Sequence, residues 1–359
     1  MTDEATLLSA CDQLASALPE GGFAVALWKQ GKELWSVQRN LRPEALLPVW
    51  STTKGPAAAT LLLALERAGL DLTTPVARVW PEFRHAINFA QLLSHQAGLA
   101  APEEEVSIFD HAAAAAGLAT QTPNWPPGTA HGYHPRSYGF LLDEISLRLT
   151  GQRLGENWRE WLATPHGLDF FIGLPESAHS RMVKVKGGRP SPRSDERAFG
   201  LAYMNAASLT RRAFDGYRGL NATWEFNHPA AWQHASPALG GIASARGIAQ
   251  FYDLLTTDVF SEKVRGWMMT EQTTGPDLVL QMPTTFTAGF QKDPLGPDGQ
   301  KLRHHYGPST AAFGHPGAGG SIGLCDPTSG LSLGLVLDVI SPGVFPRTEI
   351  LQIINAALG

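Results

Sequence analysis

The chain has little cysteine and no run of lysine or arginine residues. Cys11 and Cys325 are the only cysteines among 359 residues, and they show neither CxxC spacing nor pairing with histidine. A disulfide framework and a cysteine-based zinc site are therefore not expected. The net charge is −5 and Lys and Arg do not cluster along the sequence, so nucleic acid is not an expected partner.

Long apolar stretches and a leader-like N-terminus are also lacking. No run of about 18 or more apolar residues occurs, so no membrane-spanning segment is expected. The first residues include Asp3 and Glu4 and lack a basic region followed by an apolar core, which a signal peptide would need. We therefore expect a cytoplasmic protein. Hydrophobic residues, at 43%, are plentiful enough for a large globular core.

Periodic patterns are strongest at the two ends of the chain. Apolar spacing of the helical kind occurs at residues 4–18, 57–68, 244–255 and 347–358. Strand-like runs occur at residues 23–29, 33–38, 321–327 and 331–340. The middle of the chain contains short helical patterns joined by Pro- and Gly-rich loops.

These patterns predict an α/β (α+β) fold. An antiparallel sheet is expected to be flanked by the N- and C-terminal helices, with a mostly helical region inserted between the strands. We assign residues 1–69 and 236–359 to the sheet domain and residues 70–235 to the helical domain.

Ser51-Thr52-Thr53-Lys54 is the only S-x-x-K in the chain. Residues i and i+3 of a helix share a face, so the Lys54 amine can reach the Ser51 hydroxyl. A serine needs a neighbouring base to act as a nucleophile, and a desolvated lysine can be that base. A solvated lysine in a first helical turn would also explain the tetrapeptide alone. Pro56 should clash with the Thr52 carbonyl in a regular helix, so the helix starts tightly or only at about Thr53.

A second serine motif, Gly319-Gly-Ser321-Ile-Gly323, fits the pattern G-x-S-x-G. A nucleophile elbow of this kind needs an acidic residue and then a histidine further along the chain. His315 is the last histidine and precedes Ser321. We therefore interpret residues 319–323 as a tight glycine turn that enters a strand.

Beyond the tetrapeptide, five segments in order resemble the β-lactamase-related serine hydrolases of the penicillin-recognising superfamily. Within that superfamily the chain is most similar to the family VIII carboxylesterases. The matching segments are residues 49–83, 92–99, 126–150, 240–252 and 314–327. The resemblance covers nearly the whole chain, and it implies a β-lactamase/transpeptidase-like fold with Ser51 as nucleophile and Lys54 beside it.

The resemblance also implies a catalytic tyrosine in a Tyr-x-Asn motif. Tyr133 fills the first place of that motif, whereas Pro135 replaces the asparagine. In the implied chemistry, a Lys54 ammonium favours the Tyr133 phenolate, which takes the Ser51 proton and returns it to the leaving group. Whether Lys54 or Tyr133 is the general base stays open, because coupled groups titrate together.

The family's third motif, Lys-Thr-Gly, corresponds to His315-Pro-Gly317. A neutral histidine near pH 7.5 gives no fixed cation for a substrate carboxylate. Together with Pro135 this favours neutral esters over penicillin or peptidoglycan, unless Arg136 or Arg246 supplies the cation. His315 and Gly317 are expected at the substrate. The expected oxyanion hole consists of the backbone N–H groups of Ser51 and Ala318.

Several other residues invite a functional interpretation. Tyr138 is the rival phenol and is expected to pack. Ser94 and His95 are expected to satisfy loop backbone groups. Neither His131 with His134 nor His304 with His305 has a zinc-site spacing, and we expect no metal and no cofactor. Candidate pocket walls are Trp125, Trp232 and Phe313.

The expected function is cleavage of a small-molecule carboxylic ester through a Ser51 acyl-enzyme. Alternatives on the same site are a β-lactamase, a DD-peptidase or aminopeptidase-type amide hydrolase, and an acyltransferase. A non-catalytic binding protein that retains the fold is the alternative from another class. The oligomeric state is not indicated by the sequence.

Overall fold

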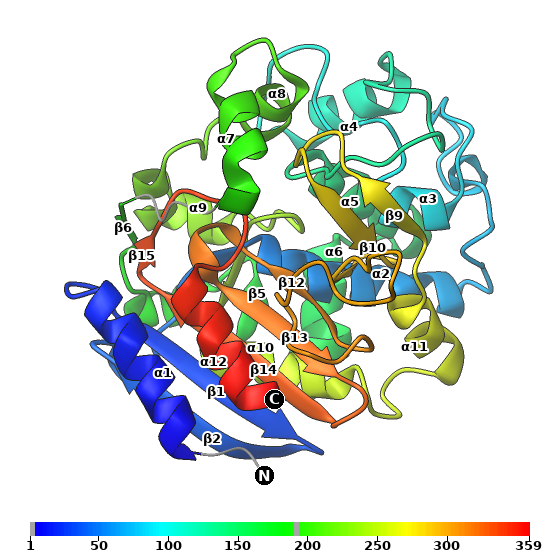
Figure 1. The fold of residues 1–359 in the computed structure, drawn as a ribbon. Helices are drawn as coiled ribbons and strands as arrows, with labels where there is room; N and C mark the ends of the chain where they lie inside the picture. The colour runs from blue at the N-terminus through cyan, green and yellow to red at the C-terminus, as the bar shows by residue number, and fades with distance from the viewer. Residues whose placement is uncertain (1–3, 190–193) are drawn as a thin grey trace.

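One large antiparallel sheet forms the frame of the structure, a computed structural model that describes residues 4–189 and 194–359 (Figure 1). Its eight strands have the order β2-β1-β14-β13-β12-β11-β10-β9. Their bounds are β1 Phe23–Lys29, β2 Lys32–Arg39, β9 Thr273–Pro276, β10 Pro283–Phe286, β11 Gln291–Lys292, β12 Phe313–Pro316, β13 Ile322–Asp326 and β14 Leu331–Leu337. The first and last parts of the chain therefore meet in one sheet, as the sequence predicts.

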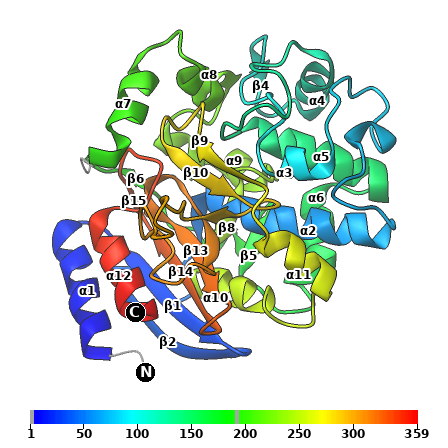
Figure 2. The same cartoon turned by 45° about the vertical axis from the view of Figure 1, so that its right-hand side comes forward.

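Two terminal helices cover one face of this sheet. α1 (Glu4–Ala17) and α12 (Thr348–Leu358) lie side by side there, and both chain ends are close to them (Figures 1 and 2). Phe23, Val25 and Leu27 of β1 point into the cluster under these helices, whereas the alternate residues of β1 pack against the opposite core. This is the two-residue alternation of a strand that is buried on both faces.

Helix α10 (Ala245–Leu254) covers the other face of the sheet. It packs so close to the strands that two sheet positions facing it are glycines. Gly323 and Gly334 are partners in the register of β13 and β14. A Cβ atom on Gly323 would lie 2.1 Å from the Tyr252 ring, and one on Gly334 would lie 2.2 Å from the Ala245 carbonyl. The last glycine of the G-x-S-x-G motif therefore serves helix–sheet packing.

Helix α2 (Lys54–Arg67) runs through the centre of the molecule, and its residues 54–65 are all buried. A 3₁₀ turn, Ser51–Thr53, precedes it. Pro56 therefore falls in the first turn of the α-helix. The N–H groups of that turn have no acceptor within the helix, so a proline there removes no helical hydrogen bond. At the other end Gly69 has φ +68°, and the Gly69 and Leu70 N–H groups donate back into the last turn, which is a Schellman ending.

The remaining helices are mostly short. They are α3 Phe89–Leu93, α4 His111–Thr120, α5 Ser137–Thr150, α6 Leu154–Trp158, α7 Arg197–Met204, α8 Leu209–Asp215, α9 Pro229–Gln233 and α11 Glu262–Met269. Of these, α3, α4, α5 and α6 lie on the far side of α2 from the terminal helices (Figure 2). α5 and α6 pack against α2.

Three small sheets join distant parts of the chain. β3 (Leu47–Trp50), β8 (Gly241–Ala243) and β5 (Phe170–Ile172) form one of them. The other two are pairs, β4 (Val106–Ser107) with β7 (Tyr217–Arg218), and β6 (Lys186–Gly187) with β15 (Val339–Ile340). Because β5 and β6 pair with strands beyond residue 235, the two predicted domains are tied together by backbone bonds, and the boundary at 70–235 stays a prediction.

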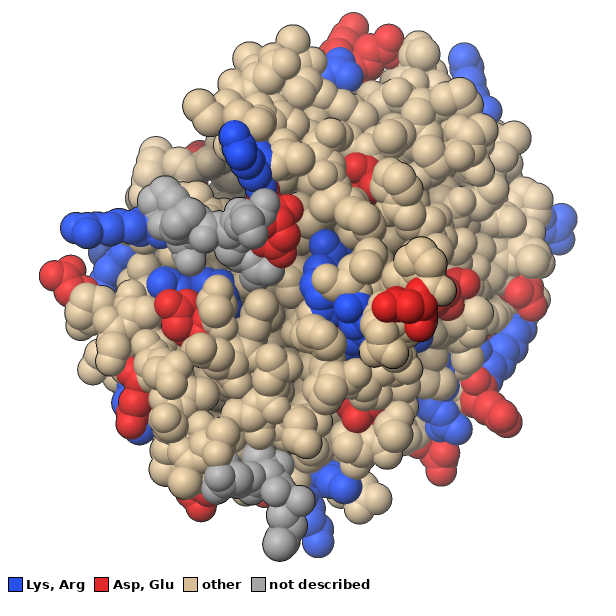
Figure 3. Space-filling view, viewed as in Figure 1, with Lys and Arg blue, Asp and Glu red and all other residues tan. Residues whose placement is uncertain are grey.

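The surface seen in Figure 3 is mostly uncharged. Lys and Arg appear on this face in separate groups, several of them beside Asp or Glu. Among residues 4–189 and 194–359, no helix combines the length and the apolarity needed to cross a membrane.

Candidate active site

Ser51 is held at the junction of β3 and α2. The residue before it, Trp50, has φ 44° and ψ −127°, a backbone conformation that a bulky side chain adopts only under constraint. The Thr53 hydroxyl donates to the Trp50 carbonyl and accepts from the Gly241 N–H at 2.8 Å. These bonds tie the turn to β8 and fix the direction in which the Ser51 side chain leaves it.

Lys54 is completely buried beside Ser51. Its Nζ lies 3.3 Å from the Ser51 Oγ and donates to the carbonyls of Pro135 at 2.8 Å and Ala238 at 2.9 Å. Burial, and secondarily the charge of Arg136, hold the Lys54 pKa well below its usual range. The amine is therefore a much stronger candidate for a proton acceptor than an exposed lysine would be.

Tyr133 reaches the same point from another part of the chain. Its ring centre is 4.9 Å from the Lys54 Nζ, and it lines the same pocket as Ser51. Burial raises the pKa of the Tyr133 phenol above its ordinary value, the interaction with the Ser51 hydroxyl opposes this rise, and the charge of Asp277 adds to it. The structure thus brings together the three residues that the sequence predicts.

The electrostatics of this cluster differ from the sequence-based expectation. That expectation has a Lys54 ammonium beside a Tyr133 phenolate, whereas burial shifts the pKa of Lys54 down and the pKa of Tyr133 up. Both directions favour a neutral amine beside a neutral phenol. The physical reason is that neither group keeps the water that would solvate its charge.

Asp277 fixes the backbone of Tyr133. Both oxygens of this buried carboxylate accept the Tyr133 N–H at 3.1 Å, and one also accepts the N–H groups of Val279 and Leu280 at 2.8 Å. The Thr284 hydroxyl donates to it at 3.1 Å. Nothing in the local sequence around Asp277 marks this role, because its partners lie up to 144 residues away.

The predicted oxyanion hole lies where the 3₁₀ turn Ala318–Gly320 approaches Ser51. Both Ala318 and Ser51 line the pocket. The Ala318 N–H has no hydrogen-bond partner within residues 4–189 and 194–359, whereas the Gly317 N–H donates to the Ser321 carbonyl at 2.7 Å. Gly317 is therefore not free to bind an anion. A Cβ atom there would lie 2.3 Å from the Val49 carbonyl, so Gly317 allows the two turns to touch.

The pocket beside Ser51 is narrow and largely apolar. Its free volume is ≈ 20 Å³, about the space of one water molecule. Besides Ser51, Tyr133 and Ala318, its walls are Phe214, Leu280, Gln291, Pro316, Val344 and Phe345. Wider grooves lie along α1 and α12 and contain none of these residues.

The prediction that the pocket walls include Trp125, Trp232 and Phe313 is wrong, because none of them lines the pocket. Trp125 donates to the Ala130 carbonyl, Trp232 donates to the Phe226 carbonyl, and Phe313 packs on another phenylalanine in the core. The actual walls come from segments that are far apart in sequence, and no local pattern distinguishes Phe214 or Phe345 from other buried aromatics.

His315 lies behind the pocket as a neutral imidazole. It is 1% exposed, its ring centre is 5.9 Å from that of Tyr133, and its Nδ1 donates to the Pro316 carbonyl at 2.8 Å. Burial, and then the nearby Lys54, lower the His315 pKa to about 3, against the effect of the Pro316 bond. His315 therefore supplies no positive charge at neutral pH.

Neither Arg136 nor Arg246 supplies a positive charge to the pocket. The Arg136 guanidinium donates to the carbonyls of Gly219 at 3.0 Å and Leu220 at 2.8 Å. Arg246 forms an ion pair with Glu33 at 2.9 Å and is largely exposed. Neither residue lines the pocket.

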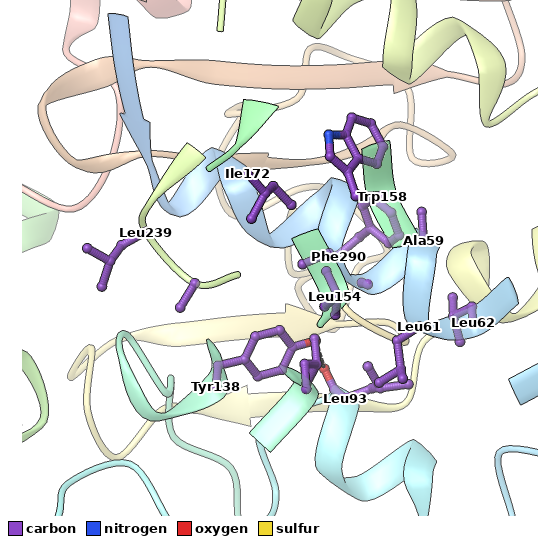
Figure 4. Close-up of a cluster of buried hydrophobic side chains, with 14 of the residues drawn as sticks. Ala59, Leu61, Leu62, Leu93, Tyr138, Leu154, Trp158, Ile172, Leu239 and Phe290 are labelled. Atoms are coloured by element: carbon purple, nitrogen blue, oxygen red, sulfur yellow. Dashed lines mark hydrogen bonds between the residues drawn. The ribbon is translucent and has the colours of Figure 1, made fainter. Parts of the chain in front are cut away.

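The rival serine and the rival phenol both have structural partners. The Ser321 hydroxyl donates to the Val49 carbonyl at 2.9 Å and is buried. The Tyr138 hydroxyl donates to the Leu93 carbonyl at 3.2 Å among apolar side chains such as Leu61 (Figure 4). Both placements agree with the packing roles that the sequence predicts.

The paired histidines are likewise bonded within loops. The His134 N–H donates to the His95 Nδ1 at 3.2 Å, and Ser94 donates to a backbone carbonyl. His131 contacts the hydroxyls of Thr273 and Thr284. Among the described residues, no three His, Cys, Asp or Glu side chains are grouped as they would be around a metal ion.

Comparison with known proteins places this site in a family. The family model described as "Beta-lactamase" matches residues 11–354. A solved family VIII carboxylesterase is 29% identical, with a TM-score of 0.85 and coverage of 98% of this chain and 96% of that chain. A penicillin-binding protein homologue from Caulobacter crescentus is also 29% identical, with a TM-score of 0.82 and the same coverage of both chains.

A relative from Mycobacterium tuberculosis is also named as an esterase and a beta-lactamase. The esterase/beta-lactamase LipL of Mycobacterium tuberculosis is 26% identical over 346 residues, which cover 88% of this chain and 76% of the relative. The match of the family model over nearly the whole sequence, together with the fold, confirms the predicted resemblance. The chain belongs to the beta-lactamase family and is a serine hydrolase of the β-lactamase fold.

Proposed function

We propose that this protein is a carboxylesterase that cleaves neutral esters through an acyl-enzyme on Ser51. The observation that carries the proposal is the meeting of Ser51, Lys54 and Tyr133 at a pocket whose other walls hold no charged side chain. An uncharged, mostly apolar wall suits an ester without a carboxylate, because a buried carboxylate would need a cation or several donors.

Lys54 is suited to receive the Ser51 proton. As a neutral amine it has two N–H groups, and the Pro135 and Ala238 carbonyls occupy both of them. The remaining lone pair then faces the Ser51 Oγ at 3.3 Å. The serine proton passes to Nζ while Oγ bonds to the ester carbonyl carbon.

The negative charge that forms on the carbonyl oxygen is held by the N–H groups of Ser51 and Ala318. When the intermediate collapses, the C–O bond breaks and the alcohol oxygen takes a proton from the Tyr133 phenol, which recovers it from the Lys54 ammonium. Water then adds to the acyl-enzyme by the same proton path in reverse, and carboxylic acid and free Ser51 result.

The proposal is tested by comparing p-nitrophenyl butyrate with nitrocefin on the same enzyme. We expect kcat/KM for the ester to exceed that for the β-lactam by at least about 10²-fold, since the latter brings a carboxylate to a pocket without a cation. A kcat/KM for nitrocefin at or above that for the ester would identify a β-lactamase instead. No turnover of either compound would point to a binding protein.

A further inference from the structure

Gln291 is the one polar side chain in the described pocket wall other than Ser51 and Tyr133. It lies on β11, paired with Gly314 of β12 and Phe286 of β10. The residue is 4% exposed and lines the pocket. An amide in such an apolar wall needs a reason, because a buried polar group without a partner destabilises the fold.

One end of the Gln291 amide is already occupied. The Tyr306 hydroxyl donates to the Gln291 Oε1 at 3.2 Å. Tyr306 is 1% exposed, and burial raises the pKa of its phenol well above the ordinary value, so it keeps its proton. That proton has no other acceptor in the described parts of the chain, which fixes the amide with its oxygen toward Tyr306 and its NH₂ group toward the pocket.

A buried ion pair holds Tyr306 in place. The Lys301 Nζ lies 3.0 Å from the Asp293 carboxylate, and the two side chains are 2% and 0% exposed. The same carboxylate accepts the backbone N–H groups of His305 at 3.0 Å and Tyr306 at 3.1 Å. The loop that orients the Gln291 amide is therefore rigidly attached to the sheet beside the pocket.

We propose that the Gln291 Nε2 group binds a second oxygen acceptor on the substrate, such as an ether, hydroxyl or carbonyl oxygen beyond the scissile group. This inference rests on the proposed esterase function and narrows its substrate class. An ester with a purely alkyl chain would displace water from the Nε2 group without replacing its hydrogen bond. An oxygen at the matching position in the chain restores that bond.

Pairs of esters that differ only by CH₂ and O test the proposal. Suitable pairs are p-nitrophenyl butyrate with methoxyacetate, p-nitrophenyl pentanoate with 3-methoxypropanoate, and butyl acetate with 2-methoxyethyl acetate. For each pair the ratio of kcat/KM, ether over alkyl, is divided by the ratio of the alkaline hydrolysis rates. We expect at least one pair to give a ratio roughly 3- to 10-fold higher in the wild type than in Gln291→Met.

Two further variants control the result. Tyr306→Phe frees the amide to rotate, so its ratio should fall part of the way toward that of Gln291→Met. Gln272→Met alters a half-buried glutamine outside the pocket and should keep the wild-type ratio. Circular dichroism confirms that each variant is folded.

The outcomes separate the two proposals. Equal ratios, within twofold, in the wild type and Gln291→Met for all three pairs would overturn the role of Gln291. A wild-type ratio in Tyr306→Phe would contradict the orientation of the amide. Failure of the wild type to hydrolyse any of the six esters would overturn the esterase function itself.

Discussion

Lys54 and Tyr133 show how burial, more than charge pairing, sets the chemistry of single residues here. Water is excluded from both side chains, and the Lys54 amine keeps only fixed partners, two carbonyls and the Ser51 hydroxyl. A lysine in this environment holds a lone pair at a pH where an exposed lysine is an ammonium. The S-x-x-K spacing predicts the proximity of the two groups, but only the packed structure reveals their protonation.

The two tyrosines near Lys54 provide a matched test. Tyr133→Phe should lower kcat by roughly 10²–10⁴-fold, because it removes the hydroxyl from the proton path and keeps the ring. Tyr138→Phe removes a hydroxyl bonded to Leu93 in the core, so kcat should stay within a few-fold of the wild type. Both variants are assayed on one ester, with folding checked by circular dichroism. A collapse of kcat in Tyr138→Phe with normal kcat in Tyr133→Phe would show that the phenols are assigned wrongly.

The pH dependence follows from the direction of the Lys54 shift. In the active form the Lys54 amine is neutral and the Tyr133 phenol keeps its proton. Burial places the Lys54 pKa well below the usual value for lysine, so the active form is reached at a lower pH. We therefore expect kcat/KM to rise with pH through a single ionisation and then to level off. Because burial raises the Tyr133 pKa, loss of its proton should cause no decline below about pH 10. A kcat/KM that falls steadily between about pH 6 and 9 would contradict this assignment.

At the scale of elements, the site depends on the contact of two short turns. The 3₁₀ turn after β12 reaches Ser51 only because Gly317 has no side chain: a Cβ atom would lie 2.2 Å from the Ser321 Oγ and 2.3 Å from the Val49 carbonyl. The role of Ser321 is part of the same contact. Its hydroxyl bonds to Val49 and lies 3.3 Å from the Thr52 hydroxyl.

Gly317→Ala should therefore push the Ala318 N–H away from the oxyanion. We expect kcat to fall by about 10²–10³-fold, the loss typical of one oxyanion donor. Gly117→Ala is the control, because that helical glycine has nothing within 4 Å of the added Cβ. It should leave kcat unchanged and slightly raise Tm. If Gly317→Ala is folded and keeps the wild-type kcat, the proposed oxyanion hole is in the wrong place.

Local signals explain which elements the sequence predicts well. β1 matches the predicted residues 23–29, and α10 begins after Ser244, whose hydroxyl accepts the Gly247 N–H at 3.0 Å as a helix cap should. Strands β9 to β12 were missed, because they are two to four residues long and are defined by partners elsewhere in the sheet. Alternation cannot be recognised over such short segments.

The site likewise contains residues that local sequence motifs predict and residues that they do not. The chemical groups Ser51, Lys54 and Tyr133 are predicted from motifs, and their catalytic roles remain predictions. The other residues of the site cannot be predicted from motifs, because Asp277, Gln291 and Phe345 become part of the site only through tertiary contacts.

At the scale of the whole molecule, the apolar cluster under the terminal helices is distinct from the one around the pocket. α1 and α12 bury the first cluster against the sheet, whereas the pocket-lining residues Tyr133, Leu280 and Phe345 belong to a separate cluster. Stability and catalysis should therefore respond to different substitutions.

Leu14 of α1 tests this separation. It is fully buried in the cluster under the terminal helices, so Leu14→Ala should lower the free energy of unfolding by about 2–5 kcal/mol, as cavity-forming substitutions do. At a temperature where the variant is folded, kcat should stay within a few-fold of the wild type. Leu34→Ala changes a leucine that is 54% exposed and should shift stability by less than about 0.5 kcal/mol. A large loss of kcat in folded Leu14→Ala would mean that the two clusters are coupled.

The residue that a fluorophosphonate labels tests the central claim most directly. After reaction, intact mass should show one adduct per chain, and peptide mapping should place it on Ser51. Ser51→Ala should give no adduct and no ester hydrolysis, whereas Ser321→Ala should still be labelled, because Ser321 is buried and bonded to Val49. An adduct that persists in Ser51→Ala and disappears in Ser321→Ala would contradict the assignment of the nucleophile.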